Sequence, residues 1–244
     1  MNTFSSIKLK SYKLSHIILT AFLFFNAAHS YAASYTWTGP SSGGTWHTAA
    51  HWSPTGIPTI NDDVTIPSLK TVSITSDAEA KTVNIQGGVE LENVTLKLET
   101  LNCIGAGGFF GAGTGGNGTG TLKFTGSASF STGSTLCTFA NIEVDTGAVL
   151  TLGNSITVKR NFINNGTINA PSKTIEIGGD VDFSQGTFSG SSHTVKLNGT
   201  ASQKIKINAS GTDFGNLEIN KTSGDVTIEE SEGTLSAASL KITS

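Results

Sequence analysis

From Val64 onward, hydrophobic and polar residues alternate in short runs, and turn residues separate the runs. Apolar positions that recur at every second residue predict strands that bury one face and expose the other. The outward positions are mainly Thr, Lys, Glu, Asn and Ser, which suit an exposed pleated face. The clearest strands are expected at 64–66, 71–75, 82–85, 89–91, 94–98, 156–159, 174–177 and 226–228.

The second half of the chain repeats itself. The string TLKFTGSAS at 121–129 returns as TVKLNGTAS at 194–202, and FANIEV at 139–144 returns as FGNLEI at 214–219. Such self-similarity is typical of a solenoid, whose units bury their apolar faces by stacking. At roughly 20–25 residues per coil, this repeat corresponds to about three coils. We therefore expect Phe139 and Phe214 to occupy equivalent core positions three coils apart.

The strand series and the repeat together define the expected fold. A β-sandwich pairs its strands across long loops and seldom repeats its own sequence, so the repeat favours a β-helix. The sequence predicts an all-β chain that forms a single-stranded right-handed parallel β-helix with an N-terminal cap segment. The dipeptides Asn117-Gly118, Asn165-Gly166 and Asn198-Gly199 are expected in tight turns, where glycine adopts positive φ without steric cost.

The N-terminus has the pattern of a secretory signal peptide. Lys8, Lys10 and Lys13 precede the short apolar run 17–25, and Ser30-Tyr31-Ala32 supplies small residues for cleavage after Ala32. The apolar run is shorter than the ~20 residues of a membrane-spanning helix, although an uncleaved anchor is the alternative. We expect residues 1–32 to be removed and the protein to be secreted or held at the cell surface after export through the Sec route.

Charge narrows the range of partners. Removal of residues 1–32 leaves 12 Lys and Arg against 18 Asp and Glu, a net charge of −6, with Arg160 as the single arginine. Nucleic acids and anionic membranes both require clustered basic residues, so we expect neither partner. The remaining chain is long enough for one elongated β domain. We divide it into a Trp/Pro-rich segment at 33–67 and β-helix coils at 68–244, with a Gly-rich loop at 105–120.

The Trp/Pro-rich segment carries a family resemblance. It contains Tyr35-Thr36-Trp37-Thr38-Gly39, then Trp46 and His51-Trp52, then Gly56-Ile57-Pro58, and it ends in Asp62-Asp63-Val64-Thr65-Ile66-Pro67. This resembles the W-x-G, N-W, G-x-P and D-x-V-x-I-P opening of secreted bacterial surface proteins, common in Bacteroidota, that are β-helical and adhesin-like or autotransporter-passenger-like. His51 stands where that pattern has Asn. The resemblance implies a fold and a surface location, and it supplies no catalytic residue.

Cysteine and histidine residues are candidates for chemistry. Cys103 and Cys137 suit either a disulfide in an exported protein or two small core side chains in stacked coils. His47 and His51 have H-x-x-x-H spacing, but their surroundings are rich in turns and no Glu follows His47, so surface or cap contacts are favoured over zinc. We interpret His193 as a turn residue.

Glycine motifs and carboxylate pairs are the remaining candidates for a site. Gly111–Gly116 matches G-x-G-x-x-G by letter but leads into a strand instead of a helix, and Gly120 replaces the Asp of a calcium-binding repeat. No cofactor or metal is therefore expected. The acid pairs Asp62/Asp63, Asp180/Asp182 and Glu229/Glu230 could serve a glycosidase, and Asp180 and Asp182 are expected to point the same way from one strand.

Three functional hypotheses follow. The first is a non-enzymatic exported β-helix, adhesin-like, that presents an extended surface to glycans or surface proteins. Trp37, Trp46 and Trp52 could stack on sugars in this role, although burial in a cap is the favoured alternative. The second is a polysaccharide lyase or glycoside hydrolase built on a β-helix. The third is the N-terminal fragment of a longer passenger protein, which the genomic sequence beyond Ser244 would reveal.

Overall fold

The computed structural model describes residues 32–104, 118–132, 138–189, 192–208, 210, 212–229 and 234–243, and the side chain of Thr132 is not described. These residues belong to one compact unit, Ala32–Ser244. The expected signal peptide, most of the Gly-rich loop, Cys137 and Glu230 lie outside the described residues.

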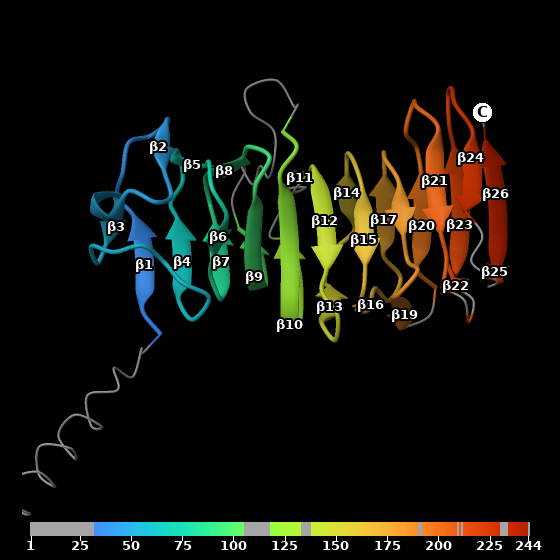
Figure 1. Ribbon diagram of the computed structural model, residues 1–244, viewed down its shortest axis with the longest axis horizontal. Helices are drawn as coiled ribbons and strands as arrows, with labels where there is room; N and C mark the ends of the chain where they lie inside the picture. Colours follow the sequence, from blue (N-terminus) through green and yellow to red (C-terminus); the bar gives the residue numbers. More distant parts are fainter. Residues whose placement is uncertain are drawn as a thin grey trace, which may run out of the picture. The chain divides into compact units, whose positions relative to one another are not determined.

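The described chain is a parallel β-solenoid of about eight turns, which confirms the predicted fold class (Figure 1). Its strands form four sheets, named A to D here, and nearly all neighbouring strands run parallel. In its second half each turn contributes three strands, as in the succession β15, β16 and β17.

Sheet A has 15 strands. Their bounds are β1 Ser34–Trp37, β3 Trp52–Ser53, β4 Asp63–Ile66, β6 Ala78–Glu79, β7 Thr82–Ile85, β9 Thr95–Cys103, β10 Thr121–Thr132, β12 Asn141–Val144, β13 Val149–Leu152, β15 Phe162–Asn164, β16 Thr167–Asn169, β18 Val181–Asp182, β19 Thr187–Ser189, β21 Gln203–Lys206 and β24 Val226–Glu229.

The other three sheets are smaller. Sheet B contains β2 Gly44–Thr45, β5 Thr71–Ile74 and β8 Gly88–Leu91. Sheet C contains β11 Thr138–Phe139, β14 Ile156–Val158, β17 Thr174–Ile177, β20 Thr194–Leu197, β23 Asn216–Asn220 and β26 Ser239–Thr243. Sheet D contains β22 Thr212–Asp213 and β25 Leu235–Ser236, and one 3-10 turn, η1, spans Ala49–His51.

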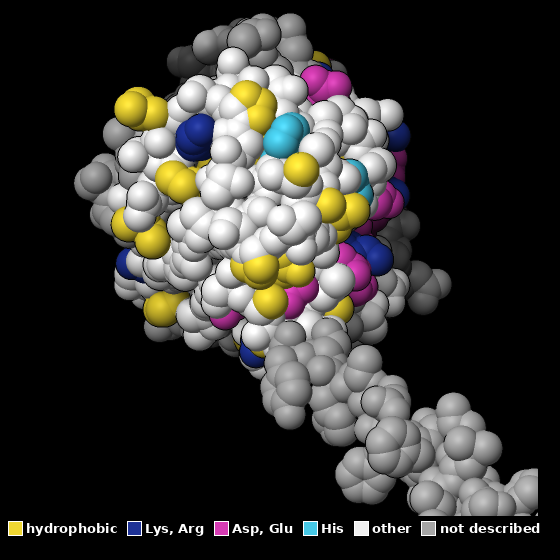
Figure 2. All heavy atoms as spheres, turned by 90° about the vertical axis from the view of Figure 1, so that its left-hand side faces the viewer, with side chains coloured by type: hydrophobic (Ala, Val, Ile, Leu, Met, Phe, Trp, Pro, Cys, Tyr) yellow, Lys and Arg dark blue, Asp and Glu magenta, His cyan; other side chains and the backbone are white. Residues whose placement is uncertain are grey.

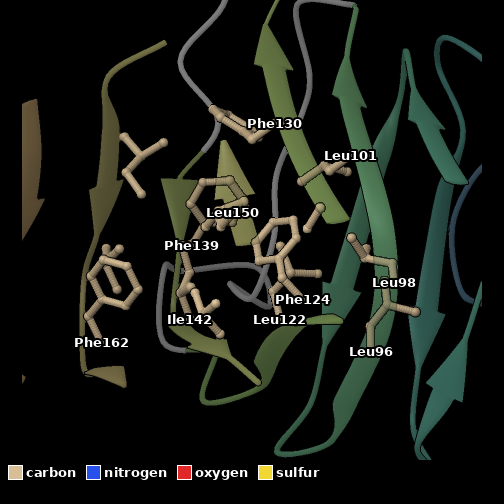
Figure 3. Packing of buried hydrophobic residues seen from close by; sticks show 14 of the residues in the cluster. Leu96, Leu98, Leu101, Leu122, Phe124, Phe130, Phe139, Ile142, Leu150 and Phe162 are labelled. Atoms are coloured by element: carbon tan, nitrogen blue, oxygen red, sulfur yellow. The ribbon is translucent and has the colours of Figure 1, made fainter. Parts of the chain in front are cut away.

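The interior is a stack of apolar side chains from the inward positions of these strands. Leu96 is in register with Leu122, and Leu122 with Ile142, so one inward column passes through three successive strands. Figure 3 shows Leu122, Phe124 and Ile142 pointing into the space between the sheets. All of these side chains are buried, as the period-2 pattern predicts. Burial of such columns is the main driving force for a fold of this kind.

The coil length can be measured along sheet A. Ile142, Phe162, Val181, Ile205 and Ile228 stack in register, so successive coils contain 20, 19, 24 and 23 residues. The internal repeat of 73–75 residues therefore spans three coils and part of a fourth.

The two copies of the repeat consequently lie on different sheets. The first copy supplies β10 and β12 of sheet A, and the second supplies β20 and β23 of sheet C. Phe139 belongs to β11, whereas Phe214 precedes β23. The prediction that they are equivalent positions three coils apart is wrong, although both rings are buried. Every face of the solenoid requires the same alternation of inward and outward residues, so one strand motif fits different faces.

The Asn-Gly turns use glycine for a different reason from the one expected. Neither Gly166 nor Gly199 has positive φ. A Cβ atom at Gly166 would instead collide with the carbonyl oxygen of Ala148, and one at Gly199 with that of Gly178. Glycine is needed there because stacked coils approach each other closely. The third dipeptide begins at Asn117, outside the described residues.

All three tryptophans are buried, with exposed fractions of 1% for Trp37, 0% for Trp46 and 2% for Trp52. The Trp52 ring lies edge-on to Trp37 and Trp46, at centroid distances of 5.0 and 4.9 Å, and its Nε1 donates to the Trp46 carbonyl oxygen at 2.7 Å. The interpretation that these rings stack on sugars is wrong, because no indole face is open to a ligand. The alternative that they are buried is confirmed.

The first strands differ from the rest in direction. β3 runs antiparallel to β1, with Trp37 opposite Trp52, and is the outermost strand of sheet A at this end. Figure 2 faces this end and shows hydrophobic side chains as separate spots among backbone and uncharged polar atoms. The role of the segment as a cap stays a prediction.

Cys103 resolves one of the open alternatives. It ends β9, is buried, and is disulfide-bonded, so it is not a free core thiol. The other cysteine of the chain, Cys137, lies outside the described residues.

Candidate functional site

The outward positions of sheet A form a ladder of charged side chains near its C-terminal end. Asp182 of β18 is in register with Lys206 of β21, and Lys206 with Glu229 of β24. Residues in register in a parallel sheet are stacked about 4.8 Å apart, so charges at these positions interact directly. The sequence supplies opposite signs on successive strands, which makes the stack attractive.

A shallow hollow of about 260 Å³ opens over this ladder. We call it the charged hollow, and it is lined by Asn161, Ile163, Asp180, Val181, Asp182, Lys204, Lys206 and Glu229. It brings together Asp180 and Asp182, as the sequence predicted, and adds two lysines and Glu229 from the following coils. Glu229 and Lys204 come from strands whose proximity to Asp182 could not be derived without the coil register.

Two ion pairs neutralise most of the charge in the hollow. Lys206 Nζ lies 3.4 Å from Asp182 Oδ2, and Lys204 Nζ lies 2.6 Å from Glu229 Oε1. Asp182 also accepts two hydrogen bonds from Ser184, from the backbone N–H at 3.0 Å and from Oγ at 2.6 Å. The lysines are half exposed, which leaves their cationic ends accessible to solvent.

These contacts hold both carboxylates in the ionised form. Burial raises the pKa of Asp182, but the Ser184 hydrogen bonds and the charge of Lys206 outweigh it, and the net pKa is lowered. The hydrogen bond from Lys204 lowers the pKa of Glu229, and the same contact raises the pKa of Lys204. At neutral pH Asp182 and Glu229 are therefore ionised, and Lys204 is protonated.

Asp180 has a structural task within the same hollow. Its Oδ1 accepts the backbone N–H of Lys204 at 2.8 Å, one coil further on. In the same way Asn161 Oδ1 accepts the N–H of Asp180 at 2.9 Å, and Asn141 Oδ1 accepts the N–H of Asn161 at 3.1 Å. Asn141, Asn161 and Asp180 thus form a side-chain ladder that links the turns before successive strands. Asp180 is one rung of this ladder, which explains a side-chain oxygen acceptor at this position.

No protein-family model, curated protein or solved structure matches this chain. The function must therefore be inferred from the fold and from the geometry of the surface.

In the predicted acid pair Asp62/Asp63, the carboxylate of Asp62 is engaged within the fold. Asp62 is buried and its carboxylate accepts hydrogen bonds from the N–H of Ala33, the N–H of Thr59 and the Thr59 hydroxyl, at 2.7–2.8 Å. Burial raises the pKa of Asp62, but these hydrogen bonds outweigh it and lower the pKa overall. Asp62 thus joins the start of the fold to a turn, and the partner of Glu229 in the third pair, Glu230, lies outside the described residues.

The histidines have separate surroundings. His47 Nδ1 lies 3.1 Å from Ser76 Oγ and lines a second shallow hollow of about 230 Å³, whereas the His51 ring packs edge-on against Trp37. His193 is buried and stacked on Phe188 at a centroid distance of 4.2 Å, so the prediction of a plain turn residue missed its packing. In the described part of the chain no group of three or more His, Cys, Asp and Glu could hold a metal ion.

Sequence analysis also missed a buried cation. Lys221 Nζ donates to the carbonyl oxygens of Gly199 and Ala201 and to Gln203 Oε1, at 2.7–2.9 Å. Burial lowers the pKa of Lys221, and the charge of Asp225 opposes this. A lysine at the end of a strand of alternating residues gives no sequence signal of burial, because its partners are mainly backbone groups.

Among the described residues no helix is long and apolar enough to span a membrane.

Proposed function

We propose that this chain is an exported, non-enzymatic β-solenoid that acts as a surface or adhesin-like scaffold and contacts other macromolecules through its outer faces. The observation that supports this most is the state of the charged hollow. Two of its carboxylates, Asp182 and Glu229, are paired with lysines and have lowered pKa values. Such a surface offers both signs of charge to a partner, and neither of these two carboxylates is suited to donate a proton at neutral pH.

Polysaccharide cleavage requires protonation states that differ from those of Asp182, Glu229 and Lys204 in the charged hollow. A glycosidase needs one carboxylic acid whose raised pKa keeps it protonated at neutral pH. Asp182 and Glu229 have lowered pKa values instead. A lyase needs a base, and the raised pKa of Lys204 keeps this amine protonated.

The exposed surface favours polar contacts over sugar stacking. Within the described ranges every aromatic side chain is buried or half-buried. Glycan-binding surfaces commonly use open aromatic faces, whereas protein partners are also recognised through complementary charge. We therefore place protein partners before glycans.

Binding of the labelled exported chain to whole cells and to matrix proteins tests the proposal. We expect saturable binding that weakens in the double variant Lys204→Ala/Lys206→Ala. The matched control is Lys196→Ala, which removes a cation paired at 3.1 Å with Glu176 on sheet C. Absence of binding to any of these surfaces would contradict the scaffold role.

The enzymatic alternative keeps one supporting observation, the gathering of acids and lysines in one hollow. Incubation of the exported chain with a panel of plant and algal polysaccharides tests it. We expect no reducing ends and no unsaturated products. Product that disappears in Asp182→Asn but persists in Glu176→Gln would overturn the non-enzymatic proposal and place the reaction in the charged hollow.

A further inference from the structure

The last coil of the described chain continues the pattern of the earlier coils but leaves its inward side chains exposed. Ile228, Leu240 and Ile242 are 45%, 60% and 68% exposed. Their register partners one coil earlier are Ile205, Leu217 and Ile219, of which the first two are buried and the third is half-buried. The apolar side chains of this coil could therefore be buried by a further layer of strands.

The same coil supplies the outermost strands of three sheets. β24 ends sheet A, β25 ends sheet D and β26 ends sheet C. We call β24 and β26 together the terminal edge. An edge strand with exposed apolar side chains is a template for pairing with another strand. In the described part of the chain nothing covers this edge.

The charge ladders indicate which charge a strand should carry to pair with the terminal edge. On sheet A the outward positions run Asp182, Lys206 and Glu229, so the ladder ends on an anion. On sheet C they run Glu176, Lys196, Glu218 and Lys241, so the ladder ends on a cation. A strand laid on β24 should therefore carry a cation, and a strand laid on β26 should carry an anion.

A second copy of this chain meets both requirements at once. A two-fold axis between β24 and β26, perpendicular to the stacking direction, turns one coil over and exchanges the two strands. β24 then pairs antiparallel with β26 of the other copy, and Glu229 of each chain faces Lys241 of the other. In that register Ile228 lies opposite Ile242 of the other copy. Among the described residues that pair in this register, charged side chains therefore remain outward and apolar ones inward, because the side-chain period of a strand is two.

We propose that two copies of this chain associate end to end through the terminal edge in this two-fold arrangement. β24 of each copy pairs with β26 of the other copy, so both copies use the same surface. The contact is therefore isologous and closes at two copies. The apolar residues supply the main attraction, and the opposite charges select the register. The contact shares Glu229 with the charged hollow, but its test requires no other binding partner.

Sedimentation of the exported chain at rising protein concentration tests the proposal. We expect a reversible monomer–dimer equilibrium that stops at the dimer. A chain that stays monomeric throughout, or that grows into open-ended assemblies, would overturn the two-fold contact. The double variant Leu240→Lys/Ile242→Lys should abolish the dimer. Leu69→Lys is the matched control, because Leu69 is 90% exposed and lies between β4 and β5.

Charge reversal gives a second test that does not remove apolar surface. Glu229→Lys and Lys241→Glu should each raise the dissociation constant at least tenfold, because each places two like charges in contact at two symmetric points. The combined variant Glu229→Lys/Lys241→Glu restores opposite charges across the interface and should recover most of the affinity. Additive weakening in the combined variant would overturn the proposed register, and circular dichroism of each variant checks that it is folded.

Discussion

The two ends of the solenoid differ in how far their apolar side chains are exposed. At the first end Trp37, Trp46 and Trp52 are at most 2% exposed, and β3 reverses direction to lie along β1. At the last coil Leu240 and Ile242 are more than half exposed on a parallel strand that simply ends the sheet. The alternating pattern alone therefore does not bury the apolar side chains of a coil, because burial occurs only where another layer covers them.

The largest test of this difference is removal of one apolar side chain at each end. Trp52→Ala removes the ring that packs on both Trp37 and Trp46, and we expect it to lower the free energy of unfolding by about 3–5 kcal/mol. Leu240→Ala at a dilution at which the chain is monomeric should change it by less than about 0.5 kcal/mol. Urea unfolding of both variants measures the two values. Equal losses would show that the last coil is packed as well as the first.

The inward positions of the strands could be predicted from the sequence, and the reason is local. Alternation at Thr82–Ile85 or Thr174–Ile177 fixes which side chains point inward, and both strands formed as expected. The partner of each strand depends instead on coil lengths of 19–24 residues, which no local pattern encodes. For that reason the equivalence of Phe139 and Phe214 was wrong.

The charged hollow shows the same division between local and long-range information. The shared orientation of Asp180 and Asp182 follows from their spacing of two residues. Their contacts with Lys204 and Lys206 depend on the 24-residue coil that separates the strands. The burial of Lys221 depends on carbonyl groups 20 or more residues earlier in the chain. Sequence spacing cannot reveal such groups before the coil register is known.

A second contrast lies between a buried and an exposed lysine near the same end. Lys221→Met leaves two carbonyl oxygens and Gln203 Oε1 without their donor, and we expect a loss of about 2–3 kcal/mol in the free energy of unfolding. Lys241→Met removes a half-exposed pair with Glu218 at 3.2 Å and should cost less than about 1 kcal/mol. Urea unfolding at low protein concentration compares them. A smaller loss for Lys221→Met than for Lys241→Met would contradict the burial of Lys221.

Acid should weaken the first end of the solenoid through Asp62. The pKa of Asp62 is lowered from its ordinary value of 3.8, so the native state binds the proton less readily than the unfolded chain. Its stabilisation is complete above that ordinary value and is lost as the pH falls through the lower, folded-state pKa.

Unfolding measured across this acid range in the wild type and in Asp62→Asn tests the role of Asp62. We expect the variant to lose about 1–2 kcal/mol at neutral pH, because charge-assisted hydrogen bonds are weakened. The difference between the two proteins should shrink as the pH falls. Parallel curves over the whole range would show that the carboxylate of Asp62 does not titrate with folding.

The smallest effect on the free energy of unfolding is expected for the ion pairs on the outer face of sheet A. It should differ between the middle of the sheet and the last coil. In the middle of sheet A, Lys123 Nζ lies 2.8 Å from Glu143 and 3.2 Å from Asp145, and the hydrogen bond to Glu143 raises the pKa of Lys123 against the opposing effect of burial. Glu143→Gln should therefore cost up to about 1 kcal/mol. Glu229→Gln at the last coil, measured on the monomer, should leave stability unchanged within experimental error, because water screens its pair with Lys204. Added salt should reduce the small loss in Glu143→Gln. If Glu229→Gln instead proved the more damaging of the two, the last coil would be more tightly held than its exposed side chains indicate.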